Sequence, residues 1–236
     1  MAAFFSDVLD EFLTPAFLNG VRKKYHYNPL RQEAEMQTDE LLSVAEKMLP
    51  LMRAEAFWER NEIRLETFRS ESLDASYEKV AMSLGNGLDD LQESYHRKER
   101  LSESYMLEVL ASEILLKGYE AYNRYMARNT EWHVARYYFP GNGKEFPLEM
   151  LPRLLETLTP KIVCNAAFCM LPKKSVAFIA ELTKDENISC KGICAGCKNI
   201  RCSNRIADEG PFRERMAGTA DMPLTYGYSR IFGGGR

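Results

Sequence analysis

The longest regular pattern in this sequence is an apolar stripe between residues 103 and 128, which predicts one long amphipathic helix beginning after Ser102. The residues of the stripe recur at intervals of three and four; they are Leu107, Leu110, Ala111, Ile114, Leu115, Gly118, Tyr119 and Tyr122. Segments of strand character lie on both sides of this helix in the chain, at residues 63–67, 77–84, 132–139 and 175–182. The chain therefore mixes helices with strands.

Other segments carry helix and turn signals. Thr38 is expected to cap a helix, and Pro50 is expected to bend or end it. The turn Gly85-Asn86-Gly87 follows a predicted strand and precedes a helix start at Leu88, and a further helix opens at residues 146–149. A corner of strand, glycine turn and helix either faces a ligand or is a structural turn that needs none.

The composition limits the class of protein. Of the 236 residues, 45% are hydrophobic, enough to bury a core, and the formal charge of −3 does not favour nucleic-acid binding. The first residues lack the basic start of a signal peptide, and no apolar run approaches the ~18 residues of a membrane span. We expect a soluble cytoplasmic protein, in which six cysteines point to metal or redox chemistry rather than disulfides.

The strand at residues 132–139 leads into a turn with the chemistry of a ligand loop. The turn is Pro140-Gly141-Asn142-Gly143, whose glycines leave the backbone amides bare. Arg136 offers a planar fork for a carboxylate, and Tyr137, Tyr138 and Phe139 offer ring faces for an adenine or a sulfonium cation. The alternative is a strand that ends in a glycine-rich turn with its aromatic side chains buried.

Four cysteines form the strongest chemical signal in the chain. Cys190, Cys194, Cys197 and Cys202 lie within thirteen residues and are surrounded by lysines and arginines. Four thiolates at such spacing close either a zinc site or an iron–sulfur cluster, and flanking cations favour the thiolate form. The alternative is a loop with free thiols. Cys164 and Cys169 flank an apolar patch and are predicted to be core residues.

The signals divide the chain into four parts. Residues 1–37 read as an N-terminal cap or docking arm, and residues 38–185 as the main α+β domain. Residues 186–208 form the cysteine-rich metal-binding segment. Residues 209–236 are a glycine-containing tail without periodicity.

Several blocks occur in an order that is typical of one family. They are Ser83-Leu84-Gly85-Asn86-Gly87-Leu88, then Ala111-Ser112-Glu113, then Pro140-Gly141-Asn142-Gly143 with Phe146-Pro147-Leu148-Glu149, then Met170-Leu171-Pro172-Lys173-Lys174-Ser175-Val176, and finally Cys194, Cys197, Cys202 and Arg205. Over residues 38–205 the chain resembles the activation domain of cobalamin-dependent methionine synthase, in its stand-alone form.

The resemblance implies a bent sheet flanked by helices and a shallow S-adenosylmethionine site that takes in Glu113 and residues 136–143. Periodicity alone places Glu113, Lys117 and Glu120 on a solvated helix face. The family's ligand loop reads R-x-x-P-G-Y, whereas here Tyr137 stands at the arginine position and Asn142 at the tyrosine. Arg136 is one residue away, and such a shift turns a strand residue to the other face unless a bulge compensates.

Two hypotheses follow from the resemblance. In the first, the chain reactivates a corrinoid methyltransferase or methionine synthase module: a flavodoxin- or ferredoxin-type donor reduces cob(II)alamin, and S-adenosylmethionine traps the product as methylcobalamin. In the second, the chain docks on the corrinoid protein without binding S-adenosylmethionine and uses its metal for electron transfer, or caps its partner. A zinc-knuckle nucleic-acid binder is a third reading, disfavoured by the acidic composition.

Overall fold

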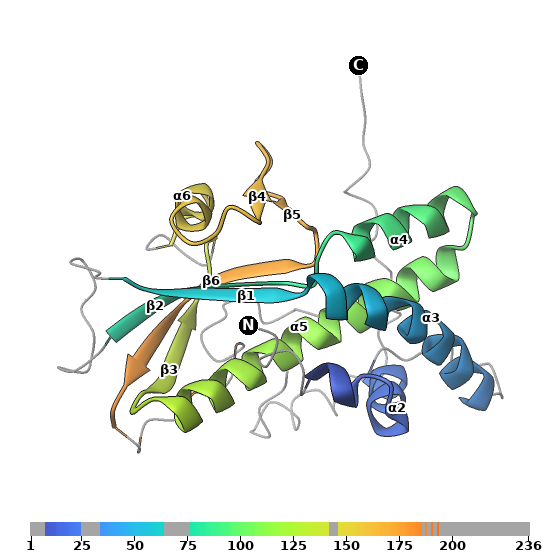
Figure 1. The fold of residues 1–236 in the computed structure, drawn as a ribbon, viewed down its shortest axis with the longest axis horizontal. Coiled ribbons are helices and arrows are strands. Elements are labelled where there is room, and N and C mark those ends of the chain that lie inside the picture. The colour runs from blue at the N-terminus through green and yellow to red at the C-terminus, as the bar shows by residue number, and fades with distance from the viewer. Residues whose placement is uncertain are drawn as a thin grey trace, which may run out of the picture. The chain divides into compact units, whose positions relative to one another are not determined.

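Four antiparallel strands form the central sheet, in the order β1-β2-β6-β3 (Figure 1). They are β1 (Phe57–Ile63), β2 (Ser76–Ser83), β3 (His133–Tyr138) and β6 (Ser175–Thr183). The computed structural model describes residues 8–24, 34–63, 76–141 and 146–185, together with residues 187, 190 and 193; for residues 34–37 it describes only the backbone. The fold is α+β, a bent antiparallel sheet flanked by helices, as predicted.

One face of the sheet is covered by the predicted long helix, α5 (Leu101–Asn129), which contacts β2 and β3. Three helices pack against α5; they are α2 (Pro15–Lys24), α3 (Ala34–Glu55) and α4 (Gly87–Arg97). Tyr122 and Met126 of α5 are fully buried, and the ring of Tyr122 lies 5.7 Å from that of Phe178 on β6. Burying side chains of this size stabilises the fold by about 1.5–3 kcal/mol each. We call the cluster of side chains buried between these helices and the sheet the large core.

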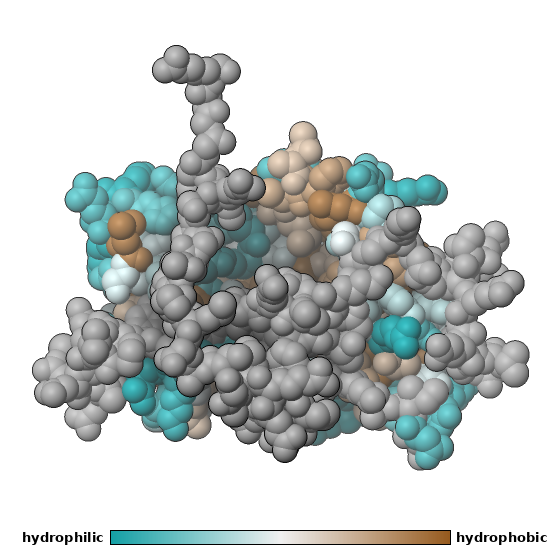
Figure 2. All heavy atoms as spheres, turned by 180° about the vertical axis from the view of Figure 1, so that it is seen from behind, coloured by the Kyte–Doolittle hydropathy of each residue, from teal (hydrophilic) through white to brown (hydrophobic). Residues whose placement is uncertain are grey.

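The opposite face of the sheet carries a smaller core. The short helix α6 (Met150–Glu156) and a two-stranded hairpin, β4 (Val163–Cys164) with β5 (Met170–Leu171), lie over it (Figure 1). Phe146 is almost fully buried there. Val163 and Leu171 pair across the hairpin and are both exposed, and hydrophobic side chains gather on the outer surface in this region (Figure 2).

The β4–β5 hairpin was not predicted, and it changes the interpretation of two cysteines. Its strands are joined by a turn in which Phe168 N donates to Asn165 O at 2.9 Å and Phe168 has a φ of 60°. A turn followed by a left-handed residue is a common hairpin closure. Cys169 is exposed and Cys164 only half-buried, so the prediction that both are core residues is wrong. The apolar run around them forms a hairpin at the surface.

Helix α3 and strand β1 differ from their predicted bounds: Thr38 does not cap the helix, and Pro50 does not end it. Helix α3 begins at Ala34, before Thr38, and continues through Pro50 to Glu55. Packing of α3 against α2, α4 and α5 outweighs the local effect of the proline. The first strand lies at Phe57–Ile63, so only Ile63 of the predicted segment 63–67 belongs to it among the described residues.

The described part of the N-terminal segment belongs to the large core. Residues 8–11 are helical, and Phe12, Leu18 and Val21 are buried in that core. This fits a cap better than a separate docking arm. The predicted tail at residues 209–236 lies outside the described residues.

The turn after β2 is held by the end of α3. Gly85 has a φ of +91°, and a Cβ atom there would lie 2.3 Å from Cβ of Glu55. The N–H of Gly87, in the first turn of α4, donates to Oε2 of Glu55 at 2.8 Å. The carboxylate of Glu55 therefore lies at the N-terminus of α4. The sequence predicted either a ligand-facing corner or a structural turn at this place.

Replacing Gly85 by alanine should destabilise the protein by about 1–3 kcal/mol, because the new side chain is strained at positive φ and collides with Glu55. Urea unfolding followed by circular dichroism measures the change. The matched control is Gly20→Ala in α2, where nothing lies within 4 Å of the added Cβ, and this change should be neutral or slightly stabilising. Equal effects of the two substitutions would contradict the packing described for Gly85.

Candidate functional site

A bulge in β3 decides which side chains face which core. Val134 pairs with Leu182 and Arg136 with Glu181, so Ala135 is an extra residue in β3. Without the bulge, Val134 and Arg136 would point to the same face of the sheet. With it, Val134 packs in the large core while Arg136 lies on the face that carries α6.

Tyr137 is buried in the large core. It is 5% exposed, and its hydroxyl donates to Oδ1 of Asn123 at 2.5 Å. Its ring makes edge contacts with Tyr119 and Phe178. Burial, followed by the nearby Cys190, raises the pKa of Tyr137 above its ordinary range, so the phenol stays protonated. Tyr137 is thus a core aromatic residue, as in the alternative interpretation of this strand.

Arg136 and Tyr138 share the opposite face with Glu181. Arg136 is exposed, and the hydroxyl of Tyr138 donates to Oε2 of Glu181 at 2.5 Å. The ring of Tyr138 stacks on Phe146 with centroids 4.8 Å apart. Burial and the bond to Glu181 raise the pKa of Tyr138. Arg136 is therefore exposed to solvent on this face, and the Tyr138 hydroxyl is bonded to Glu181.

The predicted turn is only partly described. Pro140 is half-buried, and Gly141 is exposed with a φ of +90°. The amide of Gly141 donates to the carbonyl of Phe146 at 2.7 Å, so this amide closes the loop. Asn142 and Gly143 lie outside the described residues.

Glu113 does not lie beside Arg136. It projects from α5, on the other side of the sheet, and its carboxylate is 2.5 Å from Nζ of Lys24 in α2. Its side chain is only 14% exposed, so the expected solvated position is wrong for Glu113. Lys117 and Glu120 pair with each other at 2.9 Å and are substantially exposed, as predicted.

The first cysteine of the cluster lies near Tyr137. Cys190 is half-buried against the large core and, after burial, is the next cause that raises the pKa of Tyr137. Two regions that are about fifty residues apart in the sequence are thereby brought together. Cys194, Cys197 and Cys202 lie outside the described residues, and within those residues no three potential ligands are grouped to hold a metal ion.

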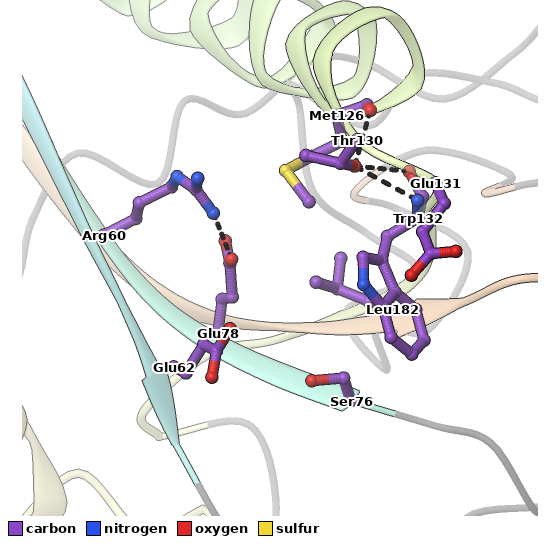
Figure 3. Close-up of a pocket in the computed structure, with 9 residues that line it drawn as sticks. All are labelled: Arg60, Glu62, Ser76, Glu78, Met126, Thr130, Glu131, Trp132 and Leu182. Carbon is purple, nitrogen blue, oxygen red and sulfur yellow. Dashed lines mark hydrogen bonds and ion pairs between the residues drawn. The ribbon is translucent and has the colours of Figure 1, made fainter.

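A pocket that sequence reasoning missed lies between the sheet and the C-terminal end of α5 (Figure 3). Its volume is about 280 Å³. The described residues that line it are Arg60, Glu62, Ser76, Glu78, Met126, Thr130, Glu131, Trp132 and Leu182. They come from β1, β2, β6 and the segment that ends α5.

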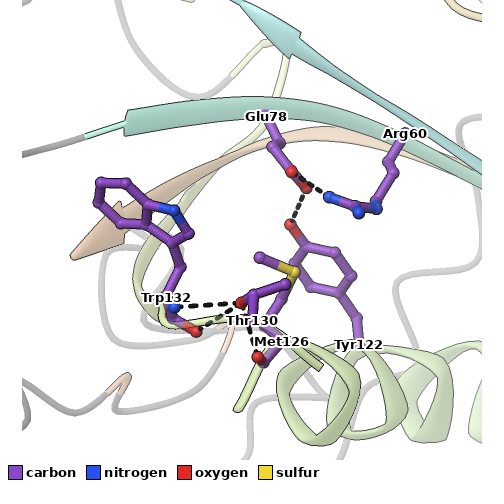
Figure 4. Close-up of polar contacts among 6 residues, drawn as sticks. All are labelled: Arg60, Glu78, Tyr122, Met126, Thr130 and Trp132. Atoms are coloured by element: carbon purple, nitrogen blue, oxygen red, sulfur yellow. Dashed lines mark hydrogen bonds and ion pairs between the residues drawn. The ribbon is translucent and has the colours of Figure 1, made fainter. Parts of the chain in front are cut away.

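A buried ion pair forms one wall of this pocket. Glu78 is 3% exposed, and its carboxylate pairs with Arg60 and accepts a hydrogen bond of 2.9 Å from the Tyr122 hydroxyl (Figure 4). Burial lowers the pKa of Arg60, but the charge of Glu78 together with Tyr125 and Tyr122 outweighs burial and raises this pKa, so the guanidinium stays charged. Burial and Glu78 together raise the pKa of Tyr122. The sequence held a signal for this buried charge. Glu78 lies two and four residues before the buried Val80 and Met82, so its side chain points to the same face of the strand.

A second polar cluster, the Lys174 cluster, joins separate parts of the chain; it consists of Ser83, Leu84, Asp89, Glu108, Lys173, Lys174 and Ser175. Ser175 donates to the hydroxyl of Ser83 at 2.8 Å, and Leu84 N donates to Lys174 O at 2.9 Å. The buried ammonium of Lys174 pairs with Glu108 on α5, and Lys173 N donates to Oδ2 of Asp89 at 2.8 Å.

Lys174 controls the ionisation of Glu108. Burial alone would raise the pKa of Glu108, but the hydrogen bond and charge of Lys174 outweigh it, so the pKa lies below its ordinary value. A depressed carboxyl pKa adds stability above the ordinary pKa, and this stability is lost as the pH falls through the lower, folded-state value.

No family model matches the chain, and no curated protein matches it. Among the helices of the described residues, none is both long and apolar enough to cross a membrane.

Arg60→Met should destabilise the protein by about 2–4 kcal/mol, because it leaves a buried carboxylate without its cation. The double variant Arg60→Met/Glu78→Leu should recover most of that loss, because neither charge of the pair then remains in the pocket wall. Urea unfolding measures both. A double variant as unstable as the sum of its two single changes would contradict the pairing.

Glu108→Gln should destabilise the protein at neutral pH, and its difference from the wild type should shrink as the pH falls below about 4.5. At low pH the protonated wild-type side chain resembles the amide. Urea unfolding at several pH values tests this, with the exposed Glu149→Gln as control. A difference that stays constant down to the acid limit would show that the charge on Glu108 contributes nothing.

Proposed function

We propose that this chain is an accessory protein of a corrinoid methyltransferase. It docks on the protein that carries cobalamin and supports the return of cob(II)alamin to methylcobalamin. An external donor supplies one electron to give cob(I)alamin, and the methyl group of S-adenosylmethionine then passes to cobalt, leaving S-adenosylhomocysteine. The methyl transfer removes the product of an unfavourable reduction.

The Lys174 cluster is the observation that supports this proposal. Ser83-to-Leu88 and Met170-to-Val176 are two of the blocks on which the resemblance rests, and they are about ninety residues apart in the sequence. The hydroxyls of Ser83 and Ser175 bond directly, and Leu84 and Lys174 are bonded through their backbones. The two blocks thus form one structural unit, which supports the interpretation that they are parts of one shared fold.

The surroundings of Tyr137 favour the version in which S-adenosylmethionine is not held at the family's arginine position. That position is 5% exposed, and its hydroxyl is bonded to Asn123. Arg136, displaced by the bulge, is the exposed alternative for a carboxylate, on the face that carries Glu181. A ligand held there would need contacts that the family's motif does not describe.

We further propose that Cys190, Cys194, Cys197 and Cys202 hold zinc or an iron–sulfur cluster. Cys190 packs against the large core, to which Tyr137 of β3 belongs, so a metal bound by Cys190 would lie beside that core. When bound, an iron–sulfur cluster would supply electrons to the partner, and zinc would only fix the segment.

The direct test is a reactivation assay. Corrinoid modules loaded with cob(II)alamin are mixed with S-adenosylmethionine and titanium(III) citrate, with and without the chain, and methylcobalamin is followed by absorbance. We expect methylcobalamin to form from cob(II)alamin faster or more completely in the presence of the chain. Equal remethylation with and without the chain, across methionine synthase modules and other corrinoid methyl-transfer proteins, would refute the proposal.

Equilibrium dialysis with labelled S-adenosylmethionine separates the two versions. We expect no saturable binding by the anaerobically prepared chain alone at physiological ligand concentrations, because Tyr137 is buried. The methyl donor in the reactivation assay is then held only when the corrinoid partner is present. Saturable binding that Arg136→Ala abolishes and Arg153→Ala preserves would show instead that Arg136 holds the ligand.

Metal analysis tests the cysteine cluster. Protein purified without oxygen should contain zinc or iron, and Cys190→Ser should lose most of it. Cys169→Ser, in the exposed β4–β5 hairpin, is the control and should retain the metal. If the two variants hold equal amounts, Cys190 is not a ligand.

A further inference from the structure

Lys79 lies in the middle of β2, an inner strand of the sheet, and points to the face that carries α6 (Figure 1). The residues two positions away on either side, Tyr77 and Ala81, belong to the smaller core on that face. In the sheet Lys79 is opposite Asn61 of β1 and Ile179 of β6, and it is half-buried there. A cationic side chain is thus partly removed from water at the centre of the sheet.

The ammonium group of Lys79 forms no ion pair or hydrogen bond with another described residue. The carboxylates at neighbouring positions on this face are engaged elsewhere. Glu59 pairs with Lys161 at 3.2 Å, and Glu181 accepts the bond from the Tyr138 hydroxyl at 2.5 Å. Burial lowers the pKa of Lys79, and no carboxylate offsets this effect.

The other lysines of the described ranges are either paired or exposed. The lysines that pair with a glutamate are Lys24, Lys117, Lys161, Lys174 and Lys184. The exposed lysines without such a pair are Lys23, Lys47, Lys98 and Lys173. Among the lysines that the structure describes, Lys79 alone is neither exposed nor paired with a carboxylate.

This environment favours the chemistry of a free amine. A lysine attacks an electrophilic carbon only in its uncharged form, and an exposed lysine, with a pKa of about 10.4, is almost entirely charged at neutral pH. Partial burial without a compensating carboxylate disfavours the ammonium form. Lys79 should therefore present more free amine than the exposed lysines do.

We propose that Lys79 is a site of acylation by small activated acyl donors, namely acyl phosphates or thioesters. The neutral amine attacks the acyl carbon and a C–N bond forms. The bond from that carbon to the phosphate oxygen or thioester sulfur breaks, and the proton lost by nitrogen leaves with the phosphate or the thiol. No ion pair with a described residue is lost, and the amide product carries no charge to desolvate. The proposal does not depend on the corrinoid partner.

The test measures the acetylation rate of each lysine. The chain is incubated with acetyl phosphate or, separately, with acetyl-CoA, and its peptides are followed by mass spectrometry. We expect Lys79 to react at least about threefold faster than the exposed Lys23, Lys47, Lys98 and Lys173, since each unit of lower pKa gives about ten times more free amine. Reaction with one donor is sufficient and identifies the class of donor. In urea that unfolds the chain, the advantage of Lys79 should disappear, because the fold creates it.

Asn61→Asp tests the missing carboxylate directly. It places an acid opposite Lys79 in the sheet, which should pair with the ammonium group and slow acetylation to the rate of the exposed lysines. The matched control Asn86→Asp makes the same change at the exposed start of α4 and should leave the Lys79 rate unaltered. The proposal is overturned if neither donor acetylates Lys79 faster than the exposed lysines of the folded chain, if the advantage persists in urea, or if Asn61→Asp does not slow the reaction.

Discussion

The pairing of β2 with β6 is the interaction on which the rest of the structure depends. The two strands match over eight consecutive positions and join segments about a hundred residues apart in the sequence. Each strand gives alternate side chains to the two cores: Val80 and Phe178 to the large one, Ala81 and Ile179 to the small one. A shift of one residue would exchange the two sets and place Glu78 away from Arg60 and Tyr122. The hydroxyl bond between Ser83 and Ser175 closes one end of this register.

The bulge in β3 has the largest consequence for function. It places Arg136 on the face of the sheet that carries α6 and leaves Tyr137 in the large core beside Tyr119 and Phe178. Cys190 packs against the large core, to which Tyr137 also belongs, whereas Arg136 lies on the opposite face of the sheet.

Long periodic patterns were predictable from the sequence, and contacts between distant segments were not. The stripe of α5 and the buried strand β6 follow from side-chain spacing, which depends only on local geometry. The start of α3 and the β4–β5 hairpin depend on tertiary packing and turn closure, which local propensity does not encode. The pocket was missed for a similar reason, because its lining comes from four separate segments. Glu78, a charged residue in a buried strand, was the one signal that pointed to it.

Docking to a corrinoid protein is the central functional claim, and a binding measurement tests it without assuming any catalytic step. A corrinoid module loaded with cob(II)alamin is titrated with the chain by calorimetry, next to the same module without corrinoid. If the chain is an accessory protein, it should bind the loaded module saturably and the empty module more weakly. Failure to bind any loaded corrinoid module, from methionine synthases or from other methyl-transfer systems, would contradict the claim.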